Sequence, residues 1–308
     1  MRHKPVLLRE VLEILNIKPD GIYVDATVGC GGHALETAKR LKSGLLIGID
    51  CDAEALRCAE ETLRDFADKI KLIHASFRDL ERILDELHIE AVDGILFDLG
   101  LSSLQLDSAH RGFSFQKDGP LDMRMDQDLK LTAKDIVNSY SSDELMHLFK
   151  KFGEERWAKR IAREIIRYRA HIEIQTTHQL AEIVKSAVPM AEKRKLDIHP
   201  ATKVFQALRI AVNDELDNLK AGLQAGFSKL RQGGVMAVIS FHSLEDRIVK
   251  NFFKEKARSC ICPPELPICR CNKKVEAELL KLIRPSEQEI KENPRARSAK
   301  LRAVRKIS

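Results

Sequence analysis

The sequence predicts an α/β fold in which an open, mostly parallel, Rossmann-like sheet carries an inserted helical segment. Between Gly21 and Asp98, short runs rich in β-branched residues alternate with segments of helical periodicity. This alternation is typical of parallel strands joined by crossover helices. It then stops for about a hundred residues that show helical periodicity without a convincing strand, and it resumes towards the C-terminus.

The first part of the sheet is predicted from four short apolar runs. The expected strands are residues 22–26, 45–50, 70–74 and 92–98, and the expected helices between them are residues 34–41, 53–66 and 80–87. The runs have the length of buried strands, whereas the intervening segments repeat their apolar residues at helical spacing.

One long helix is expected where the sheet resumes. Pro200 suits the first turn of a helix, and apolar residues recur at steps of three and four from Phe205 to Leu230. Gly233 and Gly234 are expected to end this helix. Strands at residues 235–240 and 300–306 would then complete the sheet.

The length and composition fit two packing units. A chain of 308 residues, of which 44% are hydrophobic and 32% charged, is globular and exceeds the usual size of one domain. We expect a discontinuous sheet domain of residues 1–104 and 201–308, and a mainly helical, substrate-recognition domain of residues 105–200.

The charge is distributed unevenly along the chain. Residues 1–100 contain 13 Lys and Arg against 19 Asp and Glu, whereas residues 251–308 contain 15 against 7. A basic second part favours a polyanionic partner such as a nucleic acid, because Lys and Arg neutralise phosphates. A solvated basic surface that maintains solubility is the alternative.

The sequence also predicts a cytoplasmic protein. No run approaches the roughly 18 apolar residues that a membrane helix needs, and charged residues interrupt the N-terminus. Seven cysteines without an export signal indicate reduced thiols rather than a disulfide framework.

A glycine turn after the first strand indicates a ligand site. Residues 24–33 read as a strand, a glycine-rich turn and a helix start, where glycines allow a ligand to approach the backbone. Gly29, Gly31 and Ala34 also satisfy the looser dinucleotide fingerprint, so a nicotinamide enzyme is a competing interpretation.

Residues at the next three strand ends favour S-adenosylmethionine. Asp50 could bind ribose hydroxyls, Phe77 could lie against adenine, and Asp98 could face the cationic amino group of a methionine moiety. The structural alternatives are that both aspartates cap turns and that Phe77 belongs to the core. Together with the glycine turn, the three residues favour the cofactor.

Seven motifs that span nearly the whole chain carry a family resemblance. They are residues 25–33 (DATVGCGGH), 98–103 (DLGLSS) with Gln105, 111–115 (RGFSF), 120–126 (PLDMRMD), 199–209 (HPATKVFQALR), 240–247 (SFHSLEDR) and 293–302 (NPRARSAKLR). In these motifs the chain resembles the ribosomal small-subunit RNA methyltransferase H family, also called MraW.

The resemblance implies a class I S-adenosylmethionine-dependent methyltransferase sheet. It also implies methylation of the exocyclic amino group of a cytidine in the decoding region of 16S ribosomal RNA, either free or in the small ribosomal subunit. The cofactor contacts that it implies are Gly31, Gly32, His33, Asp50, Phe77, Asp98 and Gln105. The family often has proline where this chain has Leu104, which affects loop stiffness more than it affects Gln105.

The target amine needs a group that accepts its N–H, because its lone pair is shared with the ring. Methyl transfer is an in-line displacement that needs no metal, so positioning supplies most of the catalysis. Our candidates for orienting the base are Ser102, Ser103, Asn213, His242 and Asp246. A structural histidine at a strand end is the alternative for His242.

Four arginines of the inserted segment are candidates for phosphate contact. Arg156, Arg160, Arg163 and Arg167 recur at steps of four, three and four, which places them on one helical face beside an apolar face of Trp157, Ile161 and Ile165. A solvated helix face is the alternative. Aromatic residues total 5%, so the target base is expected to be everted into a pocket rather than stacked on a platform.

A cysteine motif lies near the C-terminus. Cys260, Cys262, Cys269 and Cys271 could form a structural zinc site, although the spacing within each pair is tighter than usual. A loop of reduced thiols is the alternative.

Three function classes stay open on the sequence. They are an RNA methyltransferase, a nicotinamide oxidoreductase, and an RNA-binding assembly factor that keeps the fold without catalysis. The basic insertion and the acidic strand ends favour the first class over the second.

Overall fold

The computed structural model describes residues 5–190, 199–260, 262, 270–271 and 273–308. The chain divides into two compact units. The sheet unit comprises Met1–Gly100 and Leu216–Ser308, and the helical unit comprises Leu101–Glu215.

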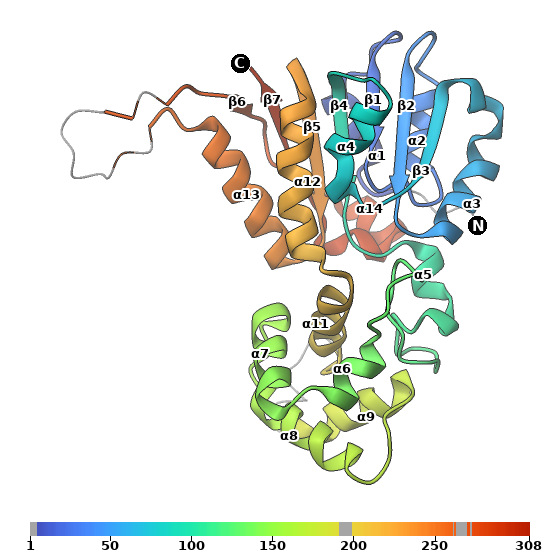
Figure 1. Cartoon of the computed structure of the whole chain (residues 1–308), viewed down its shortest axis with the longest axis vertical. Coiled ribbons are helices and arrows are strands. Elements are labelled where there is room, and N and C mark those ends of the chain that lie inside the picture. The colour runs from blue at the N-terminus through green and yellow to red at the C-terminus, as the bar shows by residue number, and fades with distance from the viewer. Residues whose placement is uncertain (1–4, 191–198, 261, 263–269, 272) are drawn as a thin grey trace. The chain divides into compact units, whose positions relative to one another are not determined.

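A seven-stranded sheet forms the centre of the sheet unit (Figure 1). Its strands are β1 (Ile22–Asp25), β2 (Leu45–Asp50), β3 (Ile70–His74), β4 (Val92–Asp98), β5 (Leu230–Ser240), β6 (Ala277–Leu279) and β7 (Lys300–Lys306). The order is β3-β2-β1-β4-β5-β7-β6. β1 to β5 are parallel, while β7 is antiparallel to both β5 and β6.

This topology confirms the predicted Rossmann-like sheet. The strand order reverses between β1 and β4, and ligands bind at such a switch point beyond the carboxyl ends of the strands. β5 begins at Leu230, earlier than the expected start at residue 235. Gly233 lies within this strand and does not end a helix. Its φ of 79° lies in the left-handed region, and the pairing with β4 shifts register at this end of β5.

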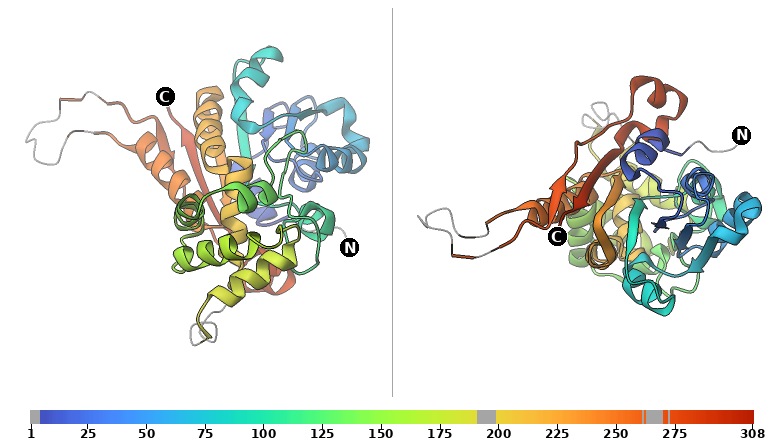
Figure 2. Two further views of the ribbon diagram at one scale, coloured as in Figure 1. Left: turned by 60° about the horizontal axis from the view of Figure 1, so that its bottom comes forward. Right: turned by 90° about the horizontal axis from the view of Figure 1, so that it is seen from above.

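Helices cover both faces of the sheet (Figures 1 and 2). One apolar core joins the strands to α4 (Leu80–Glu86), α12 (Glu215–Lys229) and α13 (Ser243–Ala257). Two further cores lie on the opposite face, against α1 (Leu8–Leu15), α2 (Gly32–Ala38) and α3 (Ala53–Leu63). The short elements are α14 (Glu287–Glu292), η1 (Arg64–Lys69), η2 (Phe77–Asp79) and η4 (Pro294–Ser298). None of the described helices is long and apolar enough to cross a membrane.

The prediction of one long helix after Pro200 is wrong. The segment forms α11 (Thr202–Asn213) and α12, and Asp214 between them has a φ of 49°. A left-handed residue ends a helix even where the apolar spacing continues across it. The boundary between the two units falls at this break, after Glu215.

The helical unit has its own core. Its elements are α5 (Ser103–Asp107), η3 (Ala109–Arg111), α6 (Ala133–Ser139), α7 (Ser142–Gly153), α8 (Ala158–Arg169), α9 (Thr177–Ala187) and α11. Their apolar faces form one buried cluster that includes Phe149, Ile161, Leu180 and Leu208. Side-chain caps at Thr132, Ser141 and Thr176 fix where α6, α7 and α9 begin.

Candidate functional site

The turn between β1 and α2 depends on glycine. Gly29 and Gly31 have φ values of 53° and 85°, which L side chains rarely adopt. A Cβ at Gly31 would also lie 3.2 Å from the Leu63 side chain. The turn therefore presents bare backbone at the carboxyl edge of the sheet.

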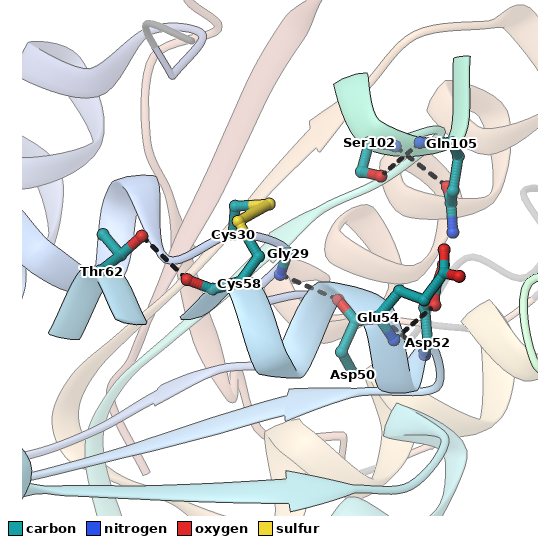
Figure 3. The surroundings of a disulfide bond; sticks show 9 residues. All are labelled: Gly29, Cys30, Asp50, Asp52, Glu54, Cys58, Thr62, Ser102 and Gln105. Carbon is teal, nitrogen blue, oxygen red and sulfur yellow. Dashed lines mark hydrogen bonds between the residues drawn. A yellow bond between two sulfur atoms is a disulfide. The ribbon is translucent and has the colours of Figure 1, made fainter. Parts of the chain in front are cut away.

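Asp50 fixes this turn from the end of β2 (Figure 3). Its Oδ2 accepts a hydrogen bond of 2.8 Å from the Gly29 amide, and its Oδ1 accepts one of 2.9 Å from the Asp52 amide. Burial raises the pKa of Asp50 to about 6 against the opposing effect of these amides. A carboxylate offers about four lone-pair positions, so Asp50 can anchor the turn and still accept a ligand hydroxyl.

Asp98 and His33 meet at the end of β4. The Asp98 Oδ2 lies 3.5 Å from His33 Nε2, and the His33 side chain is 6% exposed. The other oxygen, Asp98 Oδ1, is buried and has no hydrogen-bond partner among the described residues, whereas His33 interacts with Asp98 Oδ2 and with the Val6 backbone. Buried polar atoms without partners are rare in folded proteins, so this group has unused hydrogen-bonding capacity.

Asp25 adds a third carboxyl group, which the sequence analysis did not select. Its Oδ1 accepts a 3.3 Å hydrogen bond from the Thr27 amide, and the Thr27 hydroxyl accepts one of 2.7 Å from the Asp98 amide. Thr27 therefore connects the ends of β1 and β4. Asp25 ends its strand as Asp50 and Asp98 end theirs, and this shared position is the signal that could have found it.

Burial and the neighbouring charged groups together change the pKa values of Asp25 and His33. Burial raises the pKa of Asp25 to about 7, although His33 opposes the rise. Burial lowers the pKa of His33, but the carboxyl groups of Asp98 and Asp25 outweigh it, so the pKa is raised overall. A cationic group placed beside these carboxyl groups would favour their charged form.

Phe77 lies in η2, after β3, and packs against the core. Its ring meets the Phe97 ring edge to face, with 5.6 Å between the centroids. A Cβ at Gly222 of α12 would lie 2.6 Å from the Phe77 ring. Phe77 is partly exposed, so it combines core packing with an accessible surface at the same sheet edge.

A disulfide between Cys30 and Cys58 ties the glycine turn to α3 (Figure 3). The two Cα atoms lie 4.8 Å apart, within the range of disulfides. The expectation of reduced thiols is therefore wrong for this pair. The sequence could not show it, because 28 residues separate the two cysteines and only the packing of α3 brings them together.

Ser102, Ser103 and Gln105 lie at the start of α5, in the helical unit. The Ser102 amide donates a 3.0 Å hydrogen bond to Gln105 Oε1, and the Gln105 amide donates one of 3.2 Å to the Ser102 hydroxyl. This reciprocal capping box gives Ser102 and Gln105 a local structural role. Gln105 is 4% exposed.

Two of the other candidates for orienting the base have structural partners. Asn213 accepts a hydrogen bond from the Met125 amide and donates to the carbonyl oxygens of Met123 and Arg209. Asp246 accepts from Lys300 and Arg302, which hold its pKa below the ordinary value although burial opposes this effect.

His242 begins α13, as the structural alternative predicts. Its Nδ1 accepts a 3.4 Å hydrogen bond from the Glu245 amide, and Glu245 Oε2 accepts from the Phe241 and His242 amides. The His242 Nε2 lies 3.1 Å from Glu245 Oε1. These contacts form a capping box that places His242 just after β5.

The arginine candidates form an exposed row along α8. Arg160, Arg163 and Arg167 are exposed, whereas Ile161 and Ile165 of the same helix are buried. Arg156 departs from the prediction because it precedes the helix, and its guanidinium lies 5.2 Å from the centroid of the Trp157 ring. Arg167 forms an ion pair with Glu164 at 2.6 Å, and the carboxylate partly neutralises the positive charge that a ligand would meet.

The cysteine motif is described in part. Cys260, Cys262 and Cys271 lie between α13 and β6, and Cys269 lies outside the described residues.

Comparison with known proteins gives consistent matches over the full length of the chain. The family model described as the MraW methylase family matches residues 1–307. The chain is 55% identical over 309 residues to ribosomal RNA small subunit methyltransferase H of Syntrophotalea carbinolica, with 99% of this chain and 98% of the relative covered. It is 50% identical over 310 residues to the protein of the same name from Halothermothrix orenii, with 100% and 99% covered.

Among solved structures, the chain is similar to an rRNA methylase from Streptococcus thermophilus. The sequence identity is 11% and the TM-score 0.47, with 100% of this chain and 99% of that chain covered. A likeness of this size carries no argument about activity.

Proposed function

The chain belongs to the MraW methylase family, and from this premise we propose that it uses S-adenosylmethionine to methylate the RNA of the small ribosomal subunit. The two relatives described above are both named ribosomal RNA small subunit methyltransferase H, and this supports the substrate class. The resemblance in the motifs supports the finer assignment, which is the exocyclic amino group of a cytidine in the decoding region of 16S ribosomal RNA.

One observation carries the proposal: one oxygen of the partly exposed Asp98 carboxyl group, Oδ1, is buried and has no partner among the described residues. S-adenosylmethionine has a cationic amino-acid end, and an ammonium group donates three hydrogen bonds. Asp98 Oδ1 can accept one of them, and the acidic cluster of Asp25 and Asp98 favours the positive charge. Asp50 accepts the ribose hydroxyls, and the glycine turn leaves space for the ligand beside the backbone. The residues therefore fit the cofactor.

The reaction is an in-line displacement. S-adenosylmethionine supplies an electrophilic methyl group on a positively charged sulfur. A nitrogen–carbon bond forms at the cytidine amine, the sulfur–carbon bond breaks with its electron pair left on sulfur, and the amine loses one proton. The protein contributes by holding the donor and the amine in line and by excluding water.

The group that receives the amine proton comes from the candidates named from the sequence. Ser102 and His242 cap the starts of α5 and α13, and Asn213 and Asp246 hydrogen-bond to neighbouring residues, so all five residues stay candidates. The resemblance further assigns Gly32 and Gln105 to the cofactor.

The inserted segment, expected at residues 105–200, serves substrate recognition in this proposal. The exposed row of Arg160 and Arg163 on α8 supports it, because guanidinium groups bind phosphates in a bidentate manner.

The test is methyl transfer from labelled S-adenosylmethionine to small ribosomal subunits from cells that lack the enzyme, followed by nucleoside analysis. We expect label on the amino nitrogen of one cytidine. Asp98→Asn should abolish the label, and Asp65→Asn, which changes an exposed aspartate of the same unit, should preserve it.

Three results would contradict the proposal in different ways. Label on a ring carbon or a ribose oxygen would contradict the cytidine amine and leave the methyltransferase. Cofactor binding without transfer to any ribosomal substrate would favour a non-catalytic assembly factor. Binding of NAD without binding of S-adenosylmethionine would favour an oxidoreductase.

A further inference from the structure

Three cysteine sulfurs converge in the segment between α13 and β6. The Sγ atoms of Cys260, Cys262 and Cys271 all lie within 4.8 Å of one another. The Cys260 and Cys271 sulfurs are 3.8 Å apart, which is too far for a disulfide. Methyl transfer makes no use of this cluster.

The spacing of these sulfurs matches a tetrahedral metal site. Zinc–thiolate bonds are about 2.3 Å long, so two sulfurs of a tetrahedron lie about 3.8 Å apart. Cys260 and Cys271 have this separation. The arrangement draws its ligands from both ends of the segment, because Cys260 and Cys262 follow α13 whereas Cys271 precedes β6.

Backbone amides point at two of the sulfurs. The Cys262 amide donates to Cys260 Sγ at 3.4 Å, and the Arg270 amide donates to Cys262 Sγ at 3.4 Å. Hydrogen bonds from amides favour the charged thiolate, which is the form that binds metal.

We propose that Cys260, Cys262 and Cys271 bind a structural zinc ion that clamps the two ends of this segment together. Cys269, the fourth cysteine of the motif, lies outside the described residues, and the proposal rests on the other three. Zinc is the expected metal because it prefers tetrahedral sulfur ligands and needs no redox partner.

A bound metal ion would hold Cys260, Cys262 and Cys271 together at a place where these side chains have little apolar packing. Cys260 is exposed, and Cys262 and Cys271 are partly exposed. Near the base of the segment, Glu276 pairs with Lys256 and Lys273, each at 3.0 Å, and these two ion pairs are partly buried. Closing a segment with metal–thiolate bonds is a common means of stabilising chain that lacks a core.

The test is the metal content of the full-length chain, purified under reducing conditions and then dialysed. We expect about one zinc ion per chain. Replacement of zinc by cobalt should give a thiolate-to-cobalt charge-transfer band and the strong visible bands of tetrahedral cobalt. These readouts do not depend on methyl transfer.

Matched cysteine variants make the assignment specific. Cys260→Ser and Cys271→Ser should each lose the tightly held zinc and the cobalt spectrum, and proteases should cut the segment faster. Cys51→Ser changes a cysteine that forms no disulfide and lies outside the cluster, and this variant should retain one zinc with wild-type cleavage rates. Absence of zinc and cobalt binding in the wild-type chain would overturn the proposal. Unchanged binding in a double Cys260→Ser, Cys271→Ser variant would do the same.

Discussion

Buried polar side chains have different surroundings in the two units of the molecule. In the helical unit, the Asn213 side-chain amide makes three hydrogen bonds, two to the loop at Met123 and Met125 and one within α11. In the sheet unit, Asp98 Oδ1 is also buried, yet it has no partner among the residues described.

The difference separates structural groups from ligand-binding groups. A buried polar group that is fully paired stabilises the fold, and its loss is felt as lost stability. A buried polar group that lacks a hydrogen-bond partner lowers the stability of the fold. Such groups are typical of sites where a ligand supplies the missing hydrogen bond. The predictions below test this division, from the largest expected effect to the smallest.

Asn213→Ala should lower the free energy of unfolding by about 3 kcal/mol, because three buried hydrogen bonds are lost at about 1 kcal/mol each. Urea denaturation measures the change. Asn251→Ala, at an exposed position of α13, is the control and should change stability little. The affinity of Asn213→Ala for S-adenosylmethionine should equal that of the wild type. A large loss of affinity at unchanged stability would reverse the assignment of this residue.

Asp98→Asn should weaken binding of S-adenosylmethionine by at least about 30-fold, or about 2 kcal/mol, because a charged hydrogen bond to the ammonium group is lost. Its unfolding free energy should fall only modestly, because Asp98 Oδ1 has no described partner to lose and only the contact of Oδ2 with His33 is weakened. Equilibrium dialysis measures the affinity, with Asp65→Asn as the control. If the Asp98 variant bound S-adenosylmethionine with near-normal affinity, the methionine end of the ligand would not lie beside Asp98.

The acidic cluster should make stability depend on pH. Because burial raises the pKa of Asp25 from 3.8 to about 7, the folded protein holds a proton in this window that the unfolded chain has released. The free energy of unfolding should therefore fall as the pH rises from about 4 to 7, by about 1 kcal/mol per pH unit at most. The raised pKa of His33 acts in the same direction, since its stabilisation is lost as the pH rises.

Denaturation of the ligand-free protein at pH 5 and pH 7 measures this slope. Asp25→Asn should make the slope shallower, although Asp50, whose pKa burial raises to about 6, still contributes to it, and Asp65→Asn should leave it unchanged. An unaltered slope in the Asp25 variant would show that this carboxyl group is not the titrating one.

Arg163→Gln should reduce the salt dependence of binding to 16S ribosomal RNA. Loss of one phosphate contact lowers the slope of log K against log salt by about 0.7 to 0.9. Binding titrations at several salt concentrations measure the slope. Lys42→Gln removes one exposed charge from the sheet unit and should leave the slope unchanged. If Arg163→Gln and Lys42→Gln gave the same slope, the arginines of α8 would form a solvated helix face that does not contact phosphate.

Much of the sheet could be predicted because local patterns determine it. The expected strands at 45–50, 70–74, 92–98 and 300–306 have the bounds of β2, β3, β4 and β7. The break at Asp214 was missed because apolar spacing continues through α11 and α12, and a single left-handed residue leaves no trace in that periodicity. The three-residue β6 is too short to show a pattern and depends on its pairing with β7.

The sequence by itself determined where the glycine turn and the strand-end aspartates of this protein lie, because both are local features of a parallel sheet. Only the tertiary structure decided which polar groups are satisfied. Asp98 and His33 are 65 positions apart, and Asn213 and Met125 are 88 apart, so the fold alone sets their distances. Hydrogen bonds depend on those distances and angles, and a one-dimensional pattern cannot contain them.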